Sequence, residues 1–279
     1  MPGRRLWVSS LALALGGRVF ASHAPALERR VALIMGNARY ARAPLENAVN
    51  DGRLVAGAMK DLGFQVTQLF EATHAEMLRQ VTEWLAAASS ASVRVVYFAG
   101  HGAQYRGRNF LIPLDAALRS EDDLPAQAFQ VDDLADRLSR FSGGVNVVVL
   151  DACRSVPAAM TPLPGARPRG VKGVDLQSGF VPVAAPRGTL IAYSTSPGAV
   201  ATDNPQSQNS TYTRNLVAQL AVPGLPVEEV FKRTRAAVLQ ESNGTQTPWE
   251  TSSLVGGFCF TPNASGGCGI DVGAPPRLR

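Results

Sequence analysis

The residues best suited to covalent chemistry are scarce in this sequence of 279 residues, which contains three cysteines and three histidines. His101 lies between two glycines, directly after an apolar run over residues 93–99. Cys153 follows a second apolar run, residues 145–150, and lies 52 positions after His101. A cysteine thiolate beside an imidazolium is a nucleophile with its own proton donor, and such a pair can cleave an acyl bond. The two residues are therefore a candidate Cys–His dyad.

The local sequence predicts an accessible setting for both groups. A histidine between glycines is expected on an exposed, permissive turn. Cys153 is flanked by Arg154, and we expect it to be partly exposed in an electropositive setting that favours the thiolate. The alternative is a buried structural thiol and a turn histidine that never meet. The other histidines are weaker candidates, since His74 follows the helix cap Thr73 and His23 belongs to the N-terminal segment.

Strand-like and helix-like segments alternate along the chain and must position these residues. Strands are predicted at residues 31–35, 64–69, 93–99, 145–150, 189–194 and 253–258, with a hairpin at 105–112. Helices are predicted at 45–62, 75–88, 131–141, 212–220 and 227–241. This alternation predicts an α/β sandwich with a mostly parallel sheet. Reactive groups gather at the carboxyl ends of such strands, which is where His101 and Cys153 lie.

The composition excludes several classes of protein. With 46% hydrophobic and 18% charged residues, the chain suits one large domain, or one and a half, rather than a disordered polyelectrolyte or a multispan membrane protein. The cysteines and histidines are too few for a disulfide-dense scaffold or a multi-zinc domain.

The N-terminal segment is typical of a secretory signal. Arg4 and Arg5 precede an apolar stretch over residues 6–15, which is too short to span a bilayer, and small or apolar residues lead to Ala21. We therefore expect a signal peptide at residues 1–21 and a periplasmic or secreted protein; a buried N-terminal helix is the alternative. Removing the signal lowers the formal charge from +5 to +2. No basic stripe interleaved with aromatics follows, so no nucleic-acid partner is expected. No membrane span is expected after the signal is removed.

Long stretches resemble the caspase-like cysteine peptidases, and within them the bacterial metacaspase-like group. The matching stretches are RRVALIMGNARYARAPLENAVNDGRLVAGAMKDLGF, VVYFAGHGAQYRGRNFLIPLD, VNVVVLDACR, RGTLIAYSTSPGAVATD and TPWETSSLVGGFCF, which cover most of residues 29–260. This resemblance implies a three-layer α/β fold with a six-stranded, mainly parallel sheet flanked by helices. It also implies a larger part at 29–154, a Pro-rich loop at 155–187, a smaller part at 188–260 and a tail at 261–279.

By the same resemblance, Cys153 is the nucleophile and His101 the general acid and base of a cysteine endopeptidase. The backbone N–H groups of Gly102 and Cys153 are expected to line the oxyanion hole.

The resemblance further implies cleavage of peptides or proteins after Arg or Lys, with Asp51 and Asp151 in the pocket for that side chain. A carboxylate pair suits a guanidinium, which it can bind bidentately. The alternatives are that Asp51 is a helix-end acid or a surface acid, and that Asp151 is a partner that orients a nearby loop. Ser194, Thr195 and Ser196 end the next strand and are candidates for hydrogen bonds to the substrate backbone.

The Pro-rich loop carries candidate self-cleavage sites at Arg167, Arg169 and Lys172, because relatives are often cut between the two parts; a solvated surface loop is the alternative. No cofactor or metal is expected. Calcium activates part of the family, but Asp122 and Asp123 form no recognisable ligand pattern. The sequence does not determine the oligomeric state.

Two departures from the family pattern keep a second function open. Ser155 stands where caspases have glycine, and Ala99 where many metacaspases have serine. A caspase-fold binding or scaffold protein with a vestigial dyad is therefore the rival reading. An α/β serine hydrolase is disfavoured, since the sequence has no Gly-x-Ser-x-Gly turn.

Cys259 and Cys268 lie nine positions apart in the C-terminal region. In an exported protein they are candidates for a disulfide, which would leave Cys153 as the free thiol. The alternative is a packed Cys259 and a free thiol at Cys268.

Overall fold

The computed structural model describes residues 28–153, 180–181, 183–196 and 207–268, and describes Cys153 by its backbone. The predicted signal peptide lies outside these residues, as do most of the Pro-rich loop, its candidate cleavage sites Arg167, Arg169 and Lys172, and Ser155.

A central sheet runs through the molecule in the order β2-β1-β3-β6-β7-β8. The first five strands of this order are parallel, and β8 pairs with β7 in the antiparallel direction. Two short strands, β4 and β5, extend from the far end of β3. The strands are β1 (Arg30–Gly36), β2 (Gln65–Phe70), β3 (Val93–Tyr105), β4 (Arg108–Leu111), β5 (Phe129–Gln130), β6 (Val145–Cys153), β7 (Thr189–Tyr193) and β8 (Trp249–Ser252).

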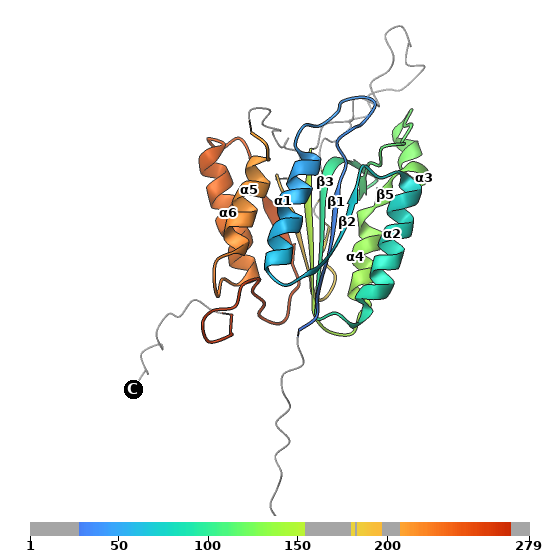
Figure 1. Cartoon of the computed structure of the whole chain (residues 1–279). Helices are drawn as coiled ribbons and strands as arrows, with labels where there is room; N and C mark the ends of the chain where they lie inside the picture. The colour runs from blue at the N-terminus through green and yellow to red at the C-terminus, as the bar shows by residue number, and fades with distance from the viewer. Residues whose placement is uncertain (1–27, 154–179, 182, 197–206, 269–279) are drawn as a thin grey trace, which may run out of the picture.

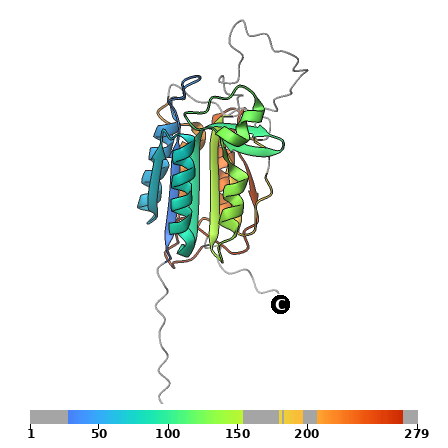
Figure 2. The same ribbon diagram turned by 90° about the vertical axis from the view of Figure 1, so that its right-hand side faces the viewer.

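Helices cover both faces of the sheet, so the molecule has three layers (Figure 1). On one face lie α1 (Ala48–Asp61), α5 (Thr211–Leu220) and α6 (Val227–Glu241). On the other lie α2 (His74–Ala87) and α4 (Val131–Ser139), which Figure 2 shows side by side. The short helices are η1 (Ala88–Ser90), η2 (Glu121–Asp123) and α3 (Leu124–Gln127). The expected fold, a mainly parallel sheet flanked by helices, is confirmed.

The two-residue period of the strands divides the core into two layers. In β1, Ala32 and Ile34 pack into the cluster that contains α1, α5 and α6, whereas Val31, Leu33 and Met35 pack into the cluster that contains α2 and α4. Because both faces are covered, the central strands are buried on both sides and carry apolar residues on both faces rather than on one.

The strand β3 is longer than the predicted segment at residues 93–99. It continues through Gly100, His101 and Gly102 to Tyr105 and then turns back at Arg106 and Gly107 into β4. The expected hairpin is therefore built from the end of β3 itself. His101 lies inside a strand and is 3% exposed, so the expectation of an exposed turn is wrong. Strand pairing on both sides of β3, with β6 and with β4, holds the glycine-rich segment extended.

The last strand is also placed differently from the prediction. Residues 253–258 are the strand expected from the sequence, but β8 is Trp249–Ser252. Pairing with β7 sets this position, since residues Leu190–Tyr193 of β7 pair with Ser252–Trp249. Val255, beyond the end of this pairing, is 80% exposed.

The helix ends follow the sequence signals. Thr73 caps α2 by accepting a hydrogen bond from the backbone N–H of Glu76, and the Glu76 carboxylate bonds back to the backbone N–H of Thr73. Gly63 follows α1 with a φ of 80° and donates to the carbonyl of Lys60, as a C-terminal glycine should. Within the described residues, no helix is long and apolar enough to cross a membrane.

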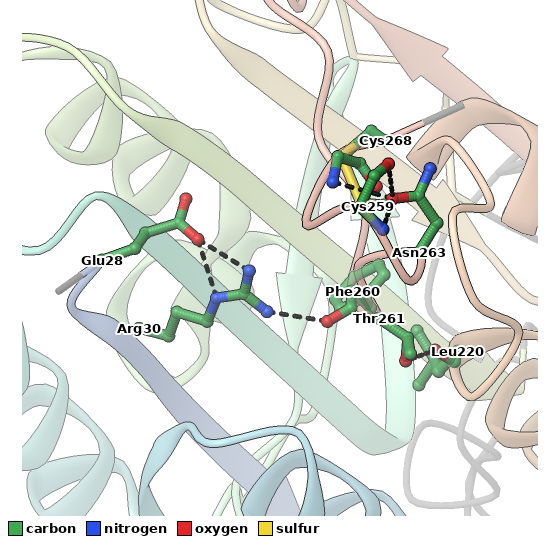
Figure 3. The surroundings of a disulfide bond; sticks show 10 residues. Glu28, Arg30, Leu220, Cys259, Phe260, Thr261, Asn263 and Cys268 are labelled. Atoms are coloured by element: carbon green, nitrogen blue, oxygen red, sulfur yellow. Dashed lines mark hydrogen bonds and ion pairs between the residues drawn. A yellow bond between two sulfur atoms is a disulfide. The ribbon is translucent and has the colours of Figure 1, made fainter. Parts of the chain in front are cut away.

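A disulfide joins Cys259 and Cys268, whose Cα atoms are 5.4 Å apart (Figure 3). Beside it, the Phe260 carbonyl accepts a hydrogen bond from Arg30, whose guanidinium also bonds to Glu28 and lies over the rings of Phe64 and Phe258. Arg30 is the first residue of β1, so the disulfide loop lies at the amino end of the parallel strands.

Candidate active site

The two candidate catalytic residues lie opposite each other at the carboxyl ends of adjacent strands. In the parallel pairing of β3 with β6, Ala99 is in register with Asp151, Gly100 with Ala152, and His101 with Cys153. Neighbouring strands are about 4.8 Å apart. Two residues separated by 52 positions in the sequence are therefore direct neighbours in the sheet.

The imidazole of His101 is held by the loop between β1 and α1. Its Nε2 lies 2.7 Å from the carbonyl oxygen of Ala43, and the ring of Tyr40 packs against it with a centroid distance of 4.4 Å. Because a carbonyl oxygen only accepts hydrogen bonds, Nε2 carries the hydrogen of this pair. The neutral imidazole then has Nδ1 as its basic nitrogen.

The backbone around Gly102 faces two different edges of β3. The N–H of His101 donates to the Tyr40 hydroxyl, and its carbonyl accepts from Ile112, both on the side of β1 and β4. Backbone groups of successive strand residues point to opposite edges. The N–H of Gly102 is therefore directed to the edge shared with β6, beside the end of that strand.

Gly102 is also restricted by the residue that packs on it. A Cβ at this position would lie 2.3 Å from the ring of Phe180, which is buried and packs at a tilt against the ring of Tyr193. The Asn109 side chain in turn holds the backbone of Val181: its amide donates to the Val181 carbonyl and accepts from the Val181 N–H, each at 2.9 Å. A side chain larger than hydrogen at Gly102 would displace this packed segment.

The two predicted pocket acids, Asp51 and Asp151, are both buried and lie on either side of one residue, Ser210. The backbone N–H of Ser210 donates to Asp51 at 2.9 Å, and its hydroxyl donates to Asp151 at 2.8 Å. Asn209 adds a second hydrogen bond to Asp51 at 3.0 Å. Since Ser210 is the N-cap of α5, the start of this helix brings together two carboxylates that are 100 positions apart in the sequence.

Asp151 is bound by further hydroxyl groups from the same face of the sheet. Thr213 donates to it at 2.8 Å, and the Tyr97 hydroxyl lies 2.6 Å from Thr213 and 3.4 Å from Asp151. Within the part of the chain that the structure describes, every hydrogen bond to the carboxylates of Asp51 and Asp151 comes from a neutral group.

The electrostatics of this acid pair are unfavourable for two negative charges. Burial, and then the nearby charge of Asp151, raise the pKa of Asp51 from 3.8 to about 7. Burial also raises the pKa of Asp151, against the effect of its hydrogen bonds. A cation placed between the carboxylates would remove this penalty and lower both pKa values.

The other predicted contact residues lie at the end of β7. Ser194 and Thr195 are each 1% exposed. Both backbone groups of Ser194 are hydrogen-bonded within the protein, since its N–H donates to the Leu150 carbonyl and its carbonyl accepts from the Gln246 side chain. Ser196 follows them and is half-buried.

Several residues of the site were not identified from the sequence. Ser210 had a usable signal, because a serine directly before an apolar-periodic segment is a helix cap. Tyr40 and Ala43 had none beyond their place after the first strand, since their role depends on a folded loop. The polar residues Asn209, Thr213 and Tyr97 have no local signal either, because only the fold brings them to the acid pair.

The described residues contain no group of three or more His, Cys, Asp or Glu that could hold a metal ion. The acid pair offers two carboxylates alone.

Comparisons with known proteins agree with this geometry. The chain is 32% identical over 133 residues to the human mucosa-associated lymphoid tissue lymphoma translocation protein 1 and to its mouse homologue. Those residues are 47% of this chain but only 16% and 15% of the two relatives, so the chain spans a small part of their length. Its fold is similar to that of the Drosophila initiator caspase Dronc, with a TM-score of 0.59, 15% identity and 84% of each chain covered.

A model of the caspase domain matches residues 29–258, which include both candidate catalytic residues and both acids of the pair. That span is most of the chain, and the fold agrees with it. The protein therefore belongs to the caspase-domain family and is a member of the caspase-like cysteine peptidase superfamily.

Proposed function

We propose that this protein is a cysteine endopeptidase of the metacaspase-like kind, which cleaves peptide bonds after Arg or Lys. The observation that carries the proposal is the register of His101 with Cys153 at the carboxyl ends of β3 and β6. The hydrogen bond between Nε2 of His101 and the Ala43 carbonyl supports the proposal, because it makes Nδ1 the nitrogen that exchanges a proton.

In the proposed reaction, the thiolate of Cys153 attacks the carbonyl carbon of the scissile bond and forms a tetrahedral intermediate. The N–H groups of Gly102 and Cys153 stabilise the oxyanion. When the C–N bond breaks, protonated His101 gives its proton to the leaving amine, and an acyl-enzyme remains. A water molecule then attacks the acyl-enzyme, with His101 taking its proton, and releases the carboxylate product and the thiolate.

The preference for basic residues rests on Asp51 and Asp151. Two buried carboxylates with neutral donors form a site that favours a cation, and a guanidinium can bond to both acids at once. The pKa of Asp51 supports this assignment, since burial and the charge of Asp151 raise it and a bound guanidinium would lower it.

Two further parts of the proposal come from the sequence. An enzyme with this preference could cut its own loop at Arg167, Arg169 or Lys172, which lie outside the described residues. We also propose export to the periplasm or the medium. The Cys259–Cys268 disulfide supports export, because disulfides persist in oxidising compartments.

The decisive experiment is a panel of fluorogenic peptides ending in Arg, Lys or Asp, assayed with and without calcium. We expect turnover of the Arg and Lys peptides by the wild-type chain and none by Cys153→Ala. Both preparations are also compared on a denaturing gel, where self-processing predicts fragments in the wild type alone.

The scaffold alternative predicts a different outcome. No cleavage of any peptide, together with no labelling of Cys153 by a thiol reagent, would favour a binding protein with a vestigial dyad. Cleavage after Asp alone would contradict the role of the acid pair while leaving the dyad in place.

A further inference from the structure

The strand that carries His101 loses its neighbour two residues before it reaches the histidine. β1 pairs with β3 as far as Gly36, which is in register with Ala99. Beyond that point no residue of β1 is left to accept a hydrogen bond from the N–H of His101. This N–H is nevertheless bonded, because the hydroxyl of Tyr40 lies 3.0 Å away and accepts from it.

The same hydroxyl closes a bridge to the next segment of chain. It donates to the carbonyl of Ile112 at 3.0 Å, and the N–H of Ile112 donates back to the carbonyl of His101. Tyr40 thus takes the place of a strand at this edge, and fixes the backbone of His101 on the side away from β6. Its ring packs on the imidazole itself at a centroid distance of 4.4 Å.

The neighbouring glycine fits this arrangement. A Cβ at Gly100 would lie 2.7 Å from the Tyr40 hydroxyl and 2.6 Å from the ring of Phe98. Only a residue without a side chain lets the tyrosine approach the strand so closely. The first glycine of Gly100-His101-Gly102 is therefore explained by Tyr40, and the second by Phe180.

The loop that carries Tyr40 is itself anchored. The Asn37 side chain bonds to Ala72 and Ile112, and the Glu71 carboxylate accepts from the N–H groups of Ala38 and Arg39 at 3.0 Å each. These contacts fix both the start of the loop and the strand end beside it. Because the loop is anchored, Tyr40 can hold His101 in a fixed position.

From these contacts we propose that Tyr40 is a positioning residue for His101, which holds the imidazole in the orientation that keeps Nε2 hydrogen-bonded to the Ala43 carbonyl and makes Nδ1 the basic nitrogen. The proposal rests on the proposed peptidase function for its kinetic consequence. Its structural consequence, the orientation and tautomer of His101, is independent of turnover.

The test uses Tyr40→Phe, which removes both hydrogen bonds of the hydroxyl and keeps the ring, in the full chain. Imidazole nitrogen resonances of His101 are measured by NMR at a pH near 8; His101→Ala identifies its signals among the three histidines. We expect the wild type to show the Nε2–H tautomer, and Tyr40→Phe to show a mixture of the two tautomers. With the Arg peptide, we expect kcat to fall roughly tenfold, with KM little changed, because two hydrogen bonds are lost.

Two further variants separate positioning from a general loss of stability. Gly100→Ala disturbs the same contact from the strand side, and we expect the same change in the His101 signals; it also serves if Tyr40→Phe does not fold. Tyr105→Phe is the matched control, since it removes a hydroxyl bonded to Asp122 four residues further along β3. It should leave the His101 signals and kcat unchanged.

The outcomes distinguish this proposal from the proposed function. Unchanged His101 signals in both Tyr40→Phe and Gly100→Ala would overturn the positioning role, even if kcat fell. Changed signals in a protein that cleaves no peptide would uphold it and reject the peptidase function instead.

Discussion

At the scale of single residues, burial of the acid pair proposed to bind substrate works against stability. Asp51 is buried beside Asp151, and its pKa is raised to about 7, because the charged form is poorly solvated and repelled by its neighbour. A carboxyl group whose pKa is higher in the folded chain stabilises the fold fully below its unfolded pKa, near 3.8. That stability is lost as the pH rises through about 7.

We therefore predict that Asp51→Asn raises stability and lowers function at the same time. The variant should melt higher than the wild type above about pH 7, and the difference should shrink toward pH 4, because the wild-type carboxyl is then neutral too. Its kcat/KM for Arg peptides should fall by at least roughly tenfold, as expected for the loss of a charged partner. Thermal melts over this pH range and peptide assays measure both effects.

Asp61→Asn is the matched control, since Asp61 is an exposed acid at the other end of the same helix. It should change neither the pH dependence nor the cleavage of Arg peptides. If Asp51→Asn kept wild-type activity on Arg peptides, the assignment of Asp51 to the substrate pocket would be wrong.

At the scale of elements, the start of α5 connects the fold to the site. Ser210 caps this helix by accepting from the N–H of Thr213, and the same hydroxyl donates to Asp151. The neighbouring Asn209 and Ser210 N–H groups bind Asp51. One helix end thus holds both carboxylates, which come from α1 and β6.

For Ser210→Ala, we expect a loss of about 1 kcal/mol in unfolding free energy, the usual value for a helix cap. We also expect a severalfold higher KM for Arg peptides, because Asp151 loses a donor to its charged form. Chemical denaturation and steady-state kinetics test the two parts separately.

Thr73→Ala provides the comparison, since Thr73 caps α2 on the opposite face of the sheet. It should lose similar stability and keep the wild-type KM. If the two variants behave alike in the kinetic assay, the contact of Ser210 with Asp151 has no role in substrate binding.

At the scale of the whole molecule, the two ends of the parallel sheet carry different features. The carboxyl ends carry His101, Asp151 and Cys153, whereas the amino end of β1 is tied to the C-terminal region through Arg30 and Phe260. The disulfide Cys259–Cys268 lies at this second end, and Cys259 also pairs with Pro226 in front of α6. We therefore expect it to stabilise the packing of the C-terminal segment rather than the candidate site.

Removal of the disulfide should therefore separate stability from activity. For a double variant, Cys259→Ala with Cys268→Ala, we expect a loss of about 2–3 kcal/mol, the value for closing a loop of this length. Its kcat/KM should equal that of the wild type at a temperature at which both are folded. Intact mass before and after reduction verifies the bond, and a folded double variant without activity would contradict the division of roles.

The order of strands and helices could be predicted from the sequence, because it depends on local periodicity. The helix at residues 227–241 has the predicted bounds, and the buried strands β1, β3 and β6 stand out in the sequence as mostly apolar segments. The sequence-based predictions are wrong where the position of a strand depends on the strand with which it pairs. β8 is placed by its pairing with β7, and the strand β3 extends through His101 because β4 and β6 pair with it.

By itself, the sequence determined the residue types available for chemistry, the α/β class and the family resemblance, since these depend on composition, spacing and motifs. Tertiary structure alone decided that His101 is buried, that Tyr40 and Ala43 hold it, and that Ser210 joins Asp51 to Asp151. The physical reason is the distance along the chain. Contacts between segments 50 to 160 residues apart arise from strand register and helix packing, which leave no local pattern in the sequence.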